Sequence, residues 1–131
     1  MTWRSIPAAT AVLAAVSLAA AAFAGADDYV FEPVNAEIKS SNVATVAVRL
    51  VHKPSGKPVT DAAIVQTRID MSPDGMASMA SAIAPLPSPG PGVYAFKAPL
   101  TMAGRWLLTV SAKVQGEPDT VIGRITFKVN R

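Results

Sequence analysis

The sequence predicts one small all-β domain, an antiparallel sandwich of about seven short strands behind an N-terminal leader. Three observations support this fold class. Apolar and polar residues alternate with a period of two in several segments, which is typical of half-buried strands. Turns rich in proline and glycine separate these segments, and no segment has the spacing of an amphipathic helix. Together these features indicate an immunoglobulin-like architecture.

The first 26 residues have the pattern of a secretory signal peptide. Arg4 is the only charged residue before Asp27, and an alanine-rich apolar stretch follows it. Small residues at the end of this stretch predict cleavage after Ala24 or after Ala26. An uncleaved membrane anchor is the alternative, but alanine contributes little to membrane insertion and no basic cluster follows.

We therefore expect residues 1–26 to be removed and residues 27–131 to form a single β-sandwich domain. This domain would be secreted across the inner membrane and would be periplasmic. It would touch a membrane only through a leader that stays uncleaved.

The strand candidates follow one another along the mature chain. In 43–51, Val46, Val48 and Leu50 share one face, and the odd-numbered residues form one face in 63–69 and in 120–130. Gly123 within the last of these predicts a bulge or a close backbone approach. Residues 85–92 are expected to be irregular because their prolines lack backbone donors. The predicted strands are 34–39, 43–51, 63–69, 80–84, 93–97, 105–114 and 120–130.

Composition excludes several classes of function. The chain has no cysteine, so a lipid-anchoring cysteine, a thiolate nucleophile, a c-type haem site and a thiolate zinc site are all excluded. Twelve basic residues, one of them in the leader, face nine acidic ones, and the basic residues are scattered singly. A nucleic-acid interface needs a clustered basic face, so we expect no nucleic-acid partner. With one histidine and no G-x-S-x-G element, we expect no enzymatic activity.

One segment carries a candidate site. Met71, Met76 and Met79 fall within nine residues of a predicted loop, and Met102 precedes the strand that contains Trp106. Thioether sulfur is a soft, uncharged ligand that holds Cu(I) and discriminates against hard cations. Methionines also fill irregular gaps under loops, so the spacing alone leaves both interpretations open.

Neighbouring polar residues complete the candidate set. Asp70 and Asp74 lie in the same loop and are candidates for outer-shell hydrogen bonds. The single histidine, His52, begins a turn and is expected to be a solvated surface residue unless that turn folds over the methionine loop. Trp106 and Tyr94 are expected in the core, although an aromatic ring can also cap a cation.

Three motifs resemble those of the FixH-like/YtkA-like family of small exported β-sandwich domains. They are DMSPDGM at 70–76, GVY at 92–94 and LTMAGRW at 100–106, and the resemblance extends over about residues 42–127. The family is associated with copper handling, heavy-metal efflux and oxidase assembly. Its members often carry a histidine near the loop methionines, where this chain has Ser72 and Asp74.

With the resemblance included, we expect a periplasmic metal-binding accessory protein that holds Cu(I) through Met71, Met76, Met79 and Met102. It would serve an unidentified metal efflux pump or oxidase-assembly component. The alternative is a metal-free protein-interaction module of the cell envelope, in which the methionine loop and residues 85–92 form an adaptable apolar contact surface.

Overall fold

The computed structural model describes residues 26–131, so the predicted leader lies outside the described residues except for Ala26. Within this range the only helical segments are two short 3-10 turns, η1 (Ala26–Asp28) and η2 (Ser72–Asp74). No helix in residues 26–131 has the length and apolar character needed to cross a membrane.

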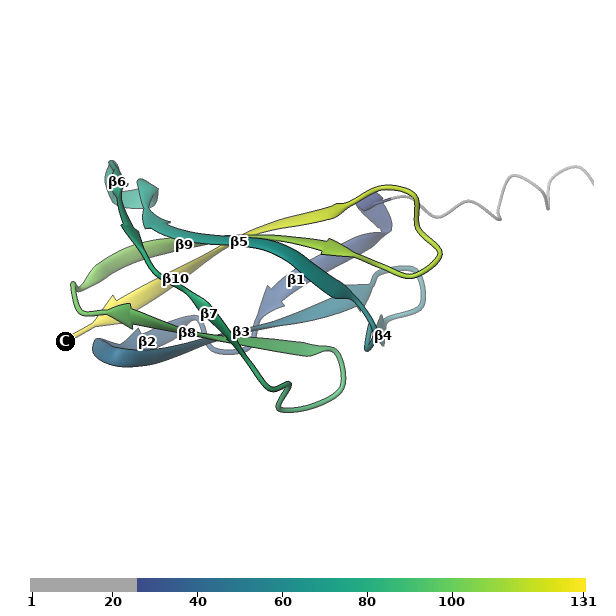
Figure 1. Cartoon of the computed structure of the whole chain (residues 1–131), viewed down its shortest axis with the longest axis horizontal. Helices are drawn as coiled ribbons and strands as arrows, with labels where there is room; N and C mark the ends of the chain where they lie inside the picture. Colours follow the sequence, from purple (N-terminus) through teal and green to yellow (C-terminus); the bar gives the residue numbers. More distant parts are fainter. Residues whose placement is uncertain (1–25) are drawn as a thin grey trace, which may run out of the picture.

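Ten strands form two sheets that pack face to face (Figure 1). We name the sheets after a central strand of each. The β3 sheet contains β1 (Tyr29–Pro33), β3 (Ser41–His52), β8 (Val93–Leu100) and β7 (Ala84–Leu86), and β4 (Lys57–Pro58) also pairs with β3. The β9 sheet contains β2 (Glu37–Lys39), β10 (Val121–Asn130), β9 (Gly104–Lys113), β5 (Ala63–Met71) and β6 (Met76–Ser81). Every pair is antiparallel except β2 with β10, and the predicted all-β sandwich is confirmed.

The strands that the sequence did not predict are short and lie at sheet edges. One of them, β7, corrects the expectation that residues 85–92 are wholly irregular, because Pro85 pairs with Phe96 of β8. An edge strand accepts proline, since the missing N–H faces no partner. The remainder of 85–92 forms the turn that leads into β8.

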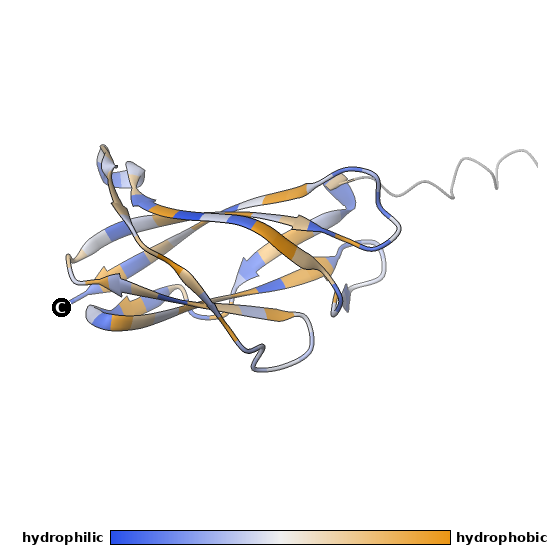
Figure 2. Cartoon of the chain, in the orientation of Figure 1, coloured by the Kyte–Doolittle hydropathy of each residue, from blue (hydrophilic) through white to orange (hydrophobic). Residues whose placement is uncertain are grey.

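The core lies between the two sheets, and the period-two pattern is visible along the strands (Figure 2). Val46, Val48 and Leu50 of β3 are fully buried, as predicted. The predicted odd-numbered face of β5 is interrupted, because Ile69 is fully buried whereas Val65 is 54% exposed. A register shift in the pairing of β5 with β9 explains this, since a bulge moves later side chains to the other face.

Gly123 of β10 marks a close approach between the sheets. A Cβ at this position would lie 2.5 Å from Cδ2 of Phe31 in β1. The pairing of β10 with β9 runs unbroken past Gly123, so this glycine does not mark a bulge. Of the two alternatives left by the sequence, the close approach is confirmed.

One segment changes from one sheet to the other. β6 pairs with β5 in the β9 sheet, and two residues later β7 pairs with β8 in the β3 sheet. The chain therefore crosses the open side of the sandwich between them (Figure 1). Met79 lies in β6, just before the crossing, and lines the same hollow as Met102 of the turn between β8 and β9.

Candidate functional site

The candidate methionine loop is a compact turn rather than a long open loop. β5 continues through Met71, η2 spans Ser72–Asp74, and β6 begins at Met76. Gly75 ends the turn in the left-handed conformation with φ of 76°, and its N–H donates to the Ser72 carbonyl at 2.9 Å. Glycine adopts this conformation without steric cost, so the sequence Pro-Asp-Gly fits the turn.

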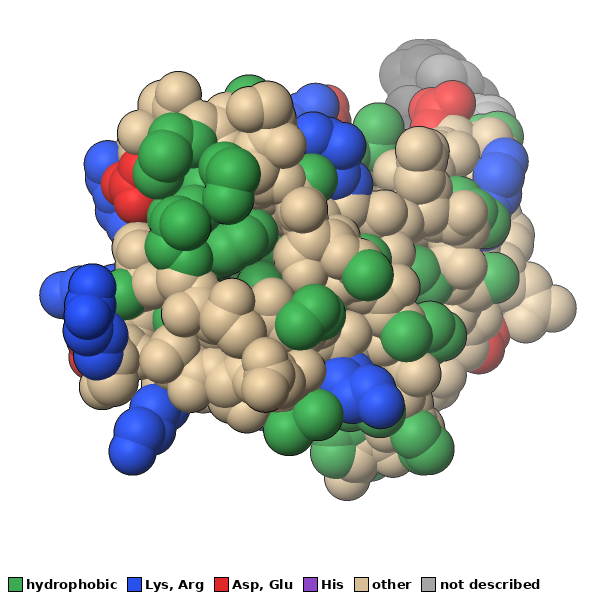
Figure 3. Space-filling view, turned by 60° about the vertical axis from the view of Figure 1, so that its left-hand side comes forward, with side chains coloured by type: hydrophobic (Ala, Val, Ile, Leu, Met, Phe, Trp, Pro, Cys, Tyr) green, Lys and Arg blue, Asp and Glu red, His purple; other side chains and the backbone are tan. Residues whose placement is uncertain are grey.

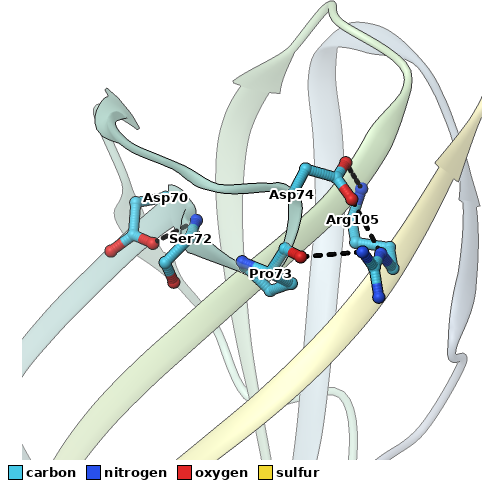
Figure 4. Close-up of polar contacts among 5 residues, drawn as sticks. All are labelled: Asp70, Ser72, Pro73, Asp74 and Arg105. Atoms are coloured by element: carbon cyan, nitrogen blue, oxygen red, sulfur yellow. Dashed lines mark hydrogen bonds and ion pairs between the residues drawn. The ribbon is translucent and has the colours of Figure 1, made fainter.

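Asp74 fastens the turn to the start of β9 (Figure 4). Arg105 donates from Nε to Asp74 Oδ1 at 2.7 Å and from its backbone N–H to Asp74 Oδ2 at 2.8 Å. Arg105 Nη2 also donates to the Pro73 carbonyl at 2.7 Å. The backbone N–H of Arg105, and then its side chain, hold the pKa of Asp74 below its ordinary value.

Asp70 performs a similar task inside the hairpin. Its Oδ1 accepts the Ser72 N–H at 2.9 Å, and its Oδ2 accepts Arg68 Nε at 2.9 Å. Asp70 is the one buried charged residue described, and hydrogen bonding to Ser72, followed by the effect of Arg68, lowers its pKa despite burial. Both carboxylates are therefore engaged in holding the turn.

Asp70 and Asp74 were predicted to form outer-shell hydrogen bonds around a metal. Both carboxylates instead accept hydrogen bonds from the turn and from β9. Among residues 26–131, no group of three or more histidine, aspartate or glutamate side chains is placed to hold a metal ion. A metal at this end of the molecule would therefore need donors of another type, and the partly exposed methionine thioethers are one such type.

Met71 is buried, unlike the other three methionines of the candidate set. It is the last residue of β5, it shares the inward face with Ile69, and only 1% of it is exposed. Its Cε lies 2.5 Å from the position that a Cβ on Gly104 would occupy. The expectation that Met71 lies in a loop is therefore corrected: Met71 ends β5, and strand alternation directs its side chain into the core.

Met79 and Met102 come together at one end of the sandwich. Both line an open surface hollow of about 440 Å³, and they are 39% and 43% exposed. Trp106 lines the same hollow, although only 4% of it is exposed. We call this the methionine hollow; its lining is Asn42, Met79, Ala80, Ser81, Ala82, Pro99, Thr101, Met102 and Trp106. Figure 3 turns this end of the molecule forward and shows hydrophobic side chains gathered on its surface.

A hydrogen bond fixes one wall of the methionine hollow. Trp106 Nε1–H donates to the carbonyl of Met102 at 3.0 Å, which ties the turn between β8 and β9 to the indole ring. The expectation that Trp106 belongs to the core is confirmed, and this residue also lines the hollow. Trp106 was not among the predicted site residues, although the spacing of Met102 and Trp106 in LTMAGRW was the available signal.

Met76 is exposed but does not line the hollow. It is the first residue of β6, it pairs with Met71, and it is 38% exposed. The pairing of β6 with β5 is irregular between Met76 and Ala80, so the strand bulges over this stretch. Met76 and Met79 therefore share a strand without sharing a regular face.

His52 lies at the opposite end of the sandwich. It closes the 12-residue β3, whose first residue, Ser41, pairs with Leu100 next to the methionine end. At about 3.3 Å per residue, the strand separates the two ends by roughly 36 Å. His52 contacts Ser55 Oγ at 2.8 Å from Nδ1 and faces the ring of Tyr29, so it does not join the methionines.

Tyr94 also has a structural role. Its hydroxyl donates to the Val59 carbonyl at 2.7 Å and accepts the Ala62 N–H at 3.1 Å. The ring packs against the core. Burial raises the pKa of its hydroxyl, and nothing brings Tyr94 to the methionine hollow.

The family comparison agrees with the motifs that form this end of the molecule. A family model described as YtkA-like matches residues 23–111, which is more than half of the chain. The chain belongs to the YtkA-like family. The matched range contains the DMSPDGM turn, Met79, Met102 and Trp106 of this YtkA-like protein, and it ends within β9. Searches of the curated proteins and of the solved structures returned no match.

Proposed function

We propose that this YtkA-like protein is an exported, non-enzymatic accessory protein that binds Cu(I) at the methionine hollow. The observation that carries the proposal is that Met79 and Met102, from two different segments of the chain, line one hollow together with Trp106. Membership of the YtkA-like family is compatible with an exported accessory domain.

The chemistry of the hollow fits a soft monovalent cation. Two partly exposed thioethers are available, and no carboxylate or imidazole lines the hollow. Thioethers favour Cu(I) over Mg²⁺ or Ca²⁺, which prefer oxygen ligands. The indole of Trp106 lines the same hollow, and an indole ring attracts a cation positioned over its face.

Exposure also supports exchange rather than permanent storage. The hollow opens to solvent, and its methionine chains are flexible and polarizable, so an arriving partner has access to the bound ion. A carrier that serves a metal efflux pump or an oxidase-assembly component in the periplasm needs this access. We therefore assign the protein to metal delivery rather than to catalysis.

The direct test is competition for Cu(I) against a chromogenic chelator, using the full chain and a Met79→Leu/Met102→Leu double variant. Leucine conserves volume and apolar character but removes the sulfur. Because loss of an outer-shell partner alone lowers metal affinity by about 10- to 100-fold, loss of both ligands should weaken competition by at least tenfold.

Matched controls separate the hollow from the other methionines. Met71→Leu alters a buried thioether and should leave Cu(I) competition unchanged, as should His52→Ala at the far end. Met76→Leu tests whether the third exposed methionine contributes. Equal competition by the wild type and the double variant would contradict the proposal.

The pH dependence gives a second readout. Thioethers carry no proton, so metal does not have to displace one. Cu(I) affinity should stay nearly constant between about pH 5 and pH 8, the range in which a histidine ligand changes charge. A steep loss of affinity towards pH 5 would indicate a site that includes His52 instead.

A further inference from the structure

The methionines of the domain fall into two classes of exposure. Met76, Met79 and Met102 are each more than a third exposed, whereas Met71 is sealed in the core. Met79 and Met102 also line the methionine hollow, which is open to solvent. Small reagents dissolved in water therefore reach these two side chains while the protein stays folded, but they reach Met71 only when the sandwich opens.

The methionine thioethers are the only sulfur groups of the chain, because it has no cysteine. Peroxides oxidise such thioethers to sulfoxides. The sulfur attacks one oxygen of hydrogen peroxide, the O–O bond breaks, and an S–O bond forms. The sulfur is oxidised by two electrons, and the other peroxide oxygen leaves as water after it takes the remaining proton. The product carries an oxygen that is a polar hydrogen-bond acceptor.

The methionine hollow has polar groups that suit a sulfoxide. Asn42 of β3 and Thr101 of the turn between β8 and β9 both line it, and both are exposed. Within residues 26–131, neither side chain is engaged in a hydrogen bond. Their N–H and O–H groups are therefore available, together with solvent, to a sulfoxide oxygen. A sulfoxide at Met71 would instead be a buried acceptor among apolar side chains.

We propose that Met79 and Met102 form a peroxide-sensitive modification site, at which sulfoxide formation switches off Cu(I) binding. The inference rests on the proposed function, because it assigns a regulation to the same hollow. The oxygen of a sulfoxide is a hard donor, which suits Mg²⁺ or Ca²⁺ better than Cu(I). The oxidised hollow therefore loses its soft ligands, whereas the buried core, including Met71, stays intact.

Peroxide and a soft cation compete for the same sulfur atoms. A thioether that is bound to a cation has less electron density to donate, so the loaded hollow should resist oxidation. Met76 is exposed to a similar degree as Met79 but lies outside the hollow. Its oxidation should therefore not depend on the metal, and it provides an internal reference for the two methionines of the hollow.

The first measurement maps oxidation in the metal-free full chain. The protein is treated with hydrogen peroxide, and peptide mass spectrometry measures the sulfoxide at each methionine over time. Met76, Met79 and Met102 should oxidise at least about tenfold faster than Met71, because Met71 is reached only when the core opens. In urea the four rates should become similar, since the fold is then the only thing removed.

The second measurement tests the consequence for metal binding. A Met76→Leu variant is oxidised until Met79 and Met102 are sulfoxides, the peroxide is removed, and competition for Cu(I) against the chromogenic chelator is measured. Competition should weaken by at least about tenfold, as in the Met79→Leu/Met102→Leu variant. Circular dichroism should show that the oxidised chain keeps its β structure.

Enzymatic reduction provides the rescue. Methionine sulfoxide reductases specific for the two sulfoxide epimers use a dithiol as reductant, which becomes a disulfide while the sulfoxide oxygen leaves as water. After this treatment and removal of the dithiol, the chain should compete for Cu(I) as it did before oxidation.

Protection by a metal completes the test. Ag(I) replaces Cu(I) here, because peroxide reacts with Cu(I) itself. Near saturation, Ag(I) should slow the oxidation of Met79 and Met102 by at least about fivefold, since only the unoccupied fraction reacts. The rate at Met76 should stay unchanged.

Several results would overturn the inference. They are oxidation of Met71 as fast as that of Met79 and Met102 in the folded chain, unchanged Cu(I) competition after oxidation, and equal protection of Met76 by Ag(I). Loss of competition together with loss of β structure would also overturn it, because general damage would then be the cause. An untreated chain that fails to compete for Cu(I) would instead contradict the proposed function, and the oxidation map would still decide the modification site by itself.

Discussion

The two sides of the β5–β6 hairpin place methionines in opposite environments, one buried and one exposed. On the inner side, Met71 is buried in the core beneath Gly104. On the outer side, Met79 of β6 is partly exposed and lines the methionine hollow together with Met102. The two sulfur atoms belong to one short stretch of sequence, yet only one of them is available to a ligand.

This difference shows that the alternation of side chains along a strand, and not closeness in the sequence, decides whether a methionine is buried or exposed. Asp70 and Asp74 fix the turn between the two sides, and this fixes which methionines face inwards. A flexible loop would allow all three methionines to face one ligand, whereas the anchored hairpin buries Met71 and leaves Met76 and Met79 exposed. Variants on each side of the hairpin should therefore have different effects.

The largest expected effect is on the inner side. Met71→Ala removes a fully buried side chain and leaves a cavity, so the free energy of unfolding should fall by about 3 kcal/mol. Met79→Ala alters an exposed side chain and should change it by less than about 0.5 kcal/mol. Urea denaturation of both variants measures the difference, with Met71→Leu as a volume-conserving control. Similar losses of unfolding free energy in the two alanine variants would contradict this difference between Met71 and Met79.

A smaller effect is expected where the inner side meets β9. Gly104 has φ of 144°, and a Cβ there would lie 2.5 Å from Met71 Cε and 2.6 Å from Asp74 Oδ2. Gly104→Ala should therefore lower the free energy of unfolding by about 2 kcal/mol, through backbone strain and the displacement of both neighbours.

The double variant Gly104→Ala/Met71→Ala sharpens this prediction. If the methyl group collides with Met71, the alanine at position 71 should relieve part of the strain, and the two losses should not add. Strictly additive losses would show that the contact with Met71 is unimportant. Thermal or urea unfolding of the two single variants and the double variant completes the cycle.

The alternation that buries Met71 was readable in the sequence. Ile69 and Met71 continue the period-two pattern of β5, so the core position follows from extending the predicted strand by two residues. The predicted strand, 63–69, stops two residues before the end of β5, so Met71 fell in a predicted loop. The main strands β3, β8, β9 and β10 were predictable for the same reason, because their pattern is local.

The methionine hollow was not readable in the same way. It depends on β6 and β7 pairing with different sheets, which no local pattern specifies. The bulge in β5 that exposes Val65 is likewise set by its register with β9. The distance of His52 from the methionines follows from the direction of β3 and its partners, which only the assembled sandwich defines.

The smallest expected change in the free energy of unfolding concerns Asp70, which holds the turn of the hairpin, and this change depends on pH. Asp70 has a lowered pKa because its charged form accepts hydrogen bonds from Ser72 and Arg68. Its stabilising contribution is therefore complete above the pKa of the unfolded chain, about 3.9, and is lost as the pH falls through the lower pKa of the folded state.

At neutral pH, Asp70→Asn should lower the free energy of unfolding by about 1–2 kcal/mol, because the charge-assisted contact with Arg68 is lost while an oxygen acceptor for Ser72 remains. The difference between wild type and variant should narrow below about pH 4. Asp74 titrates in both proteins, so its own effect cancels from the difference. Urea unfolding of the two proteins across this pH range measures the difference in their free energies of unfolding. If that difference stays constant into acid, the charge on Asp70 does not hold the turn that keeps Met71 inside and Met79 outside.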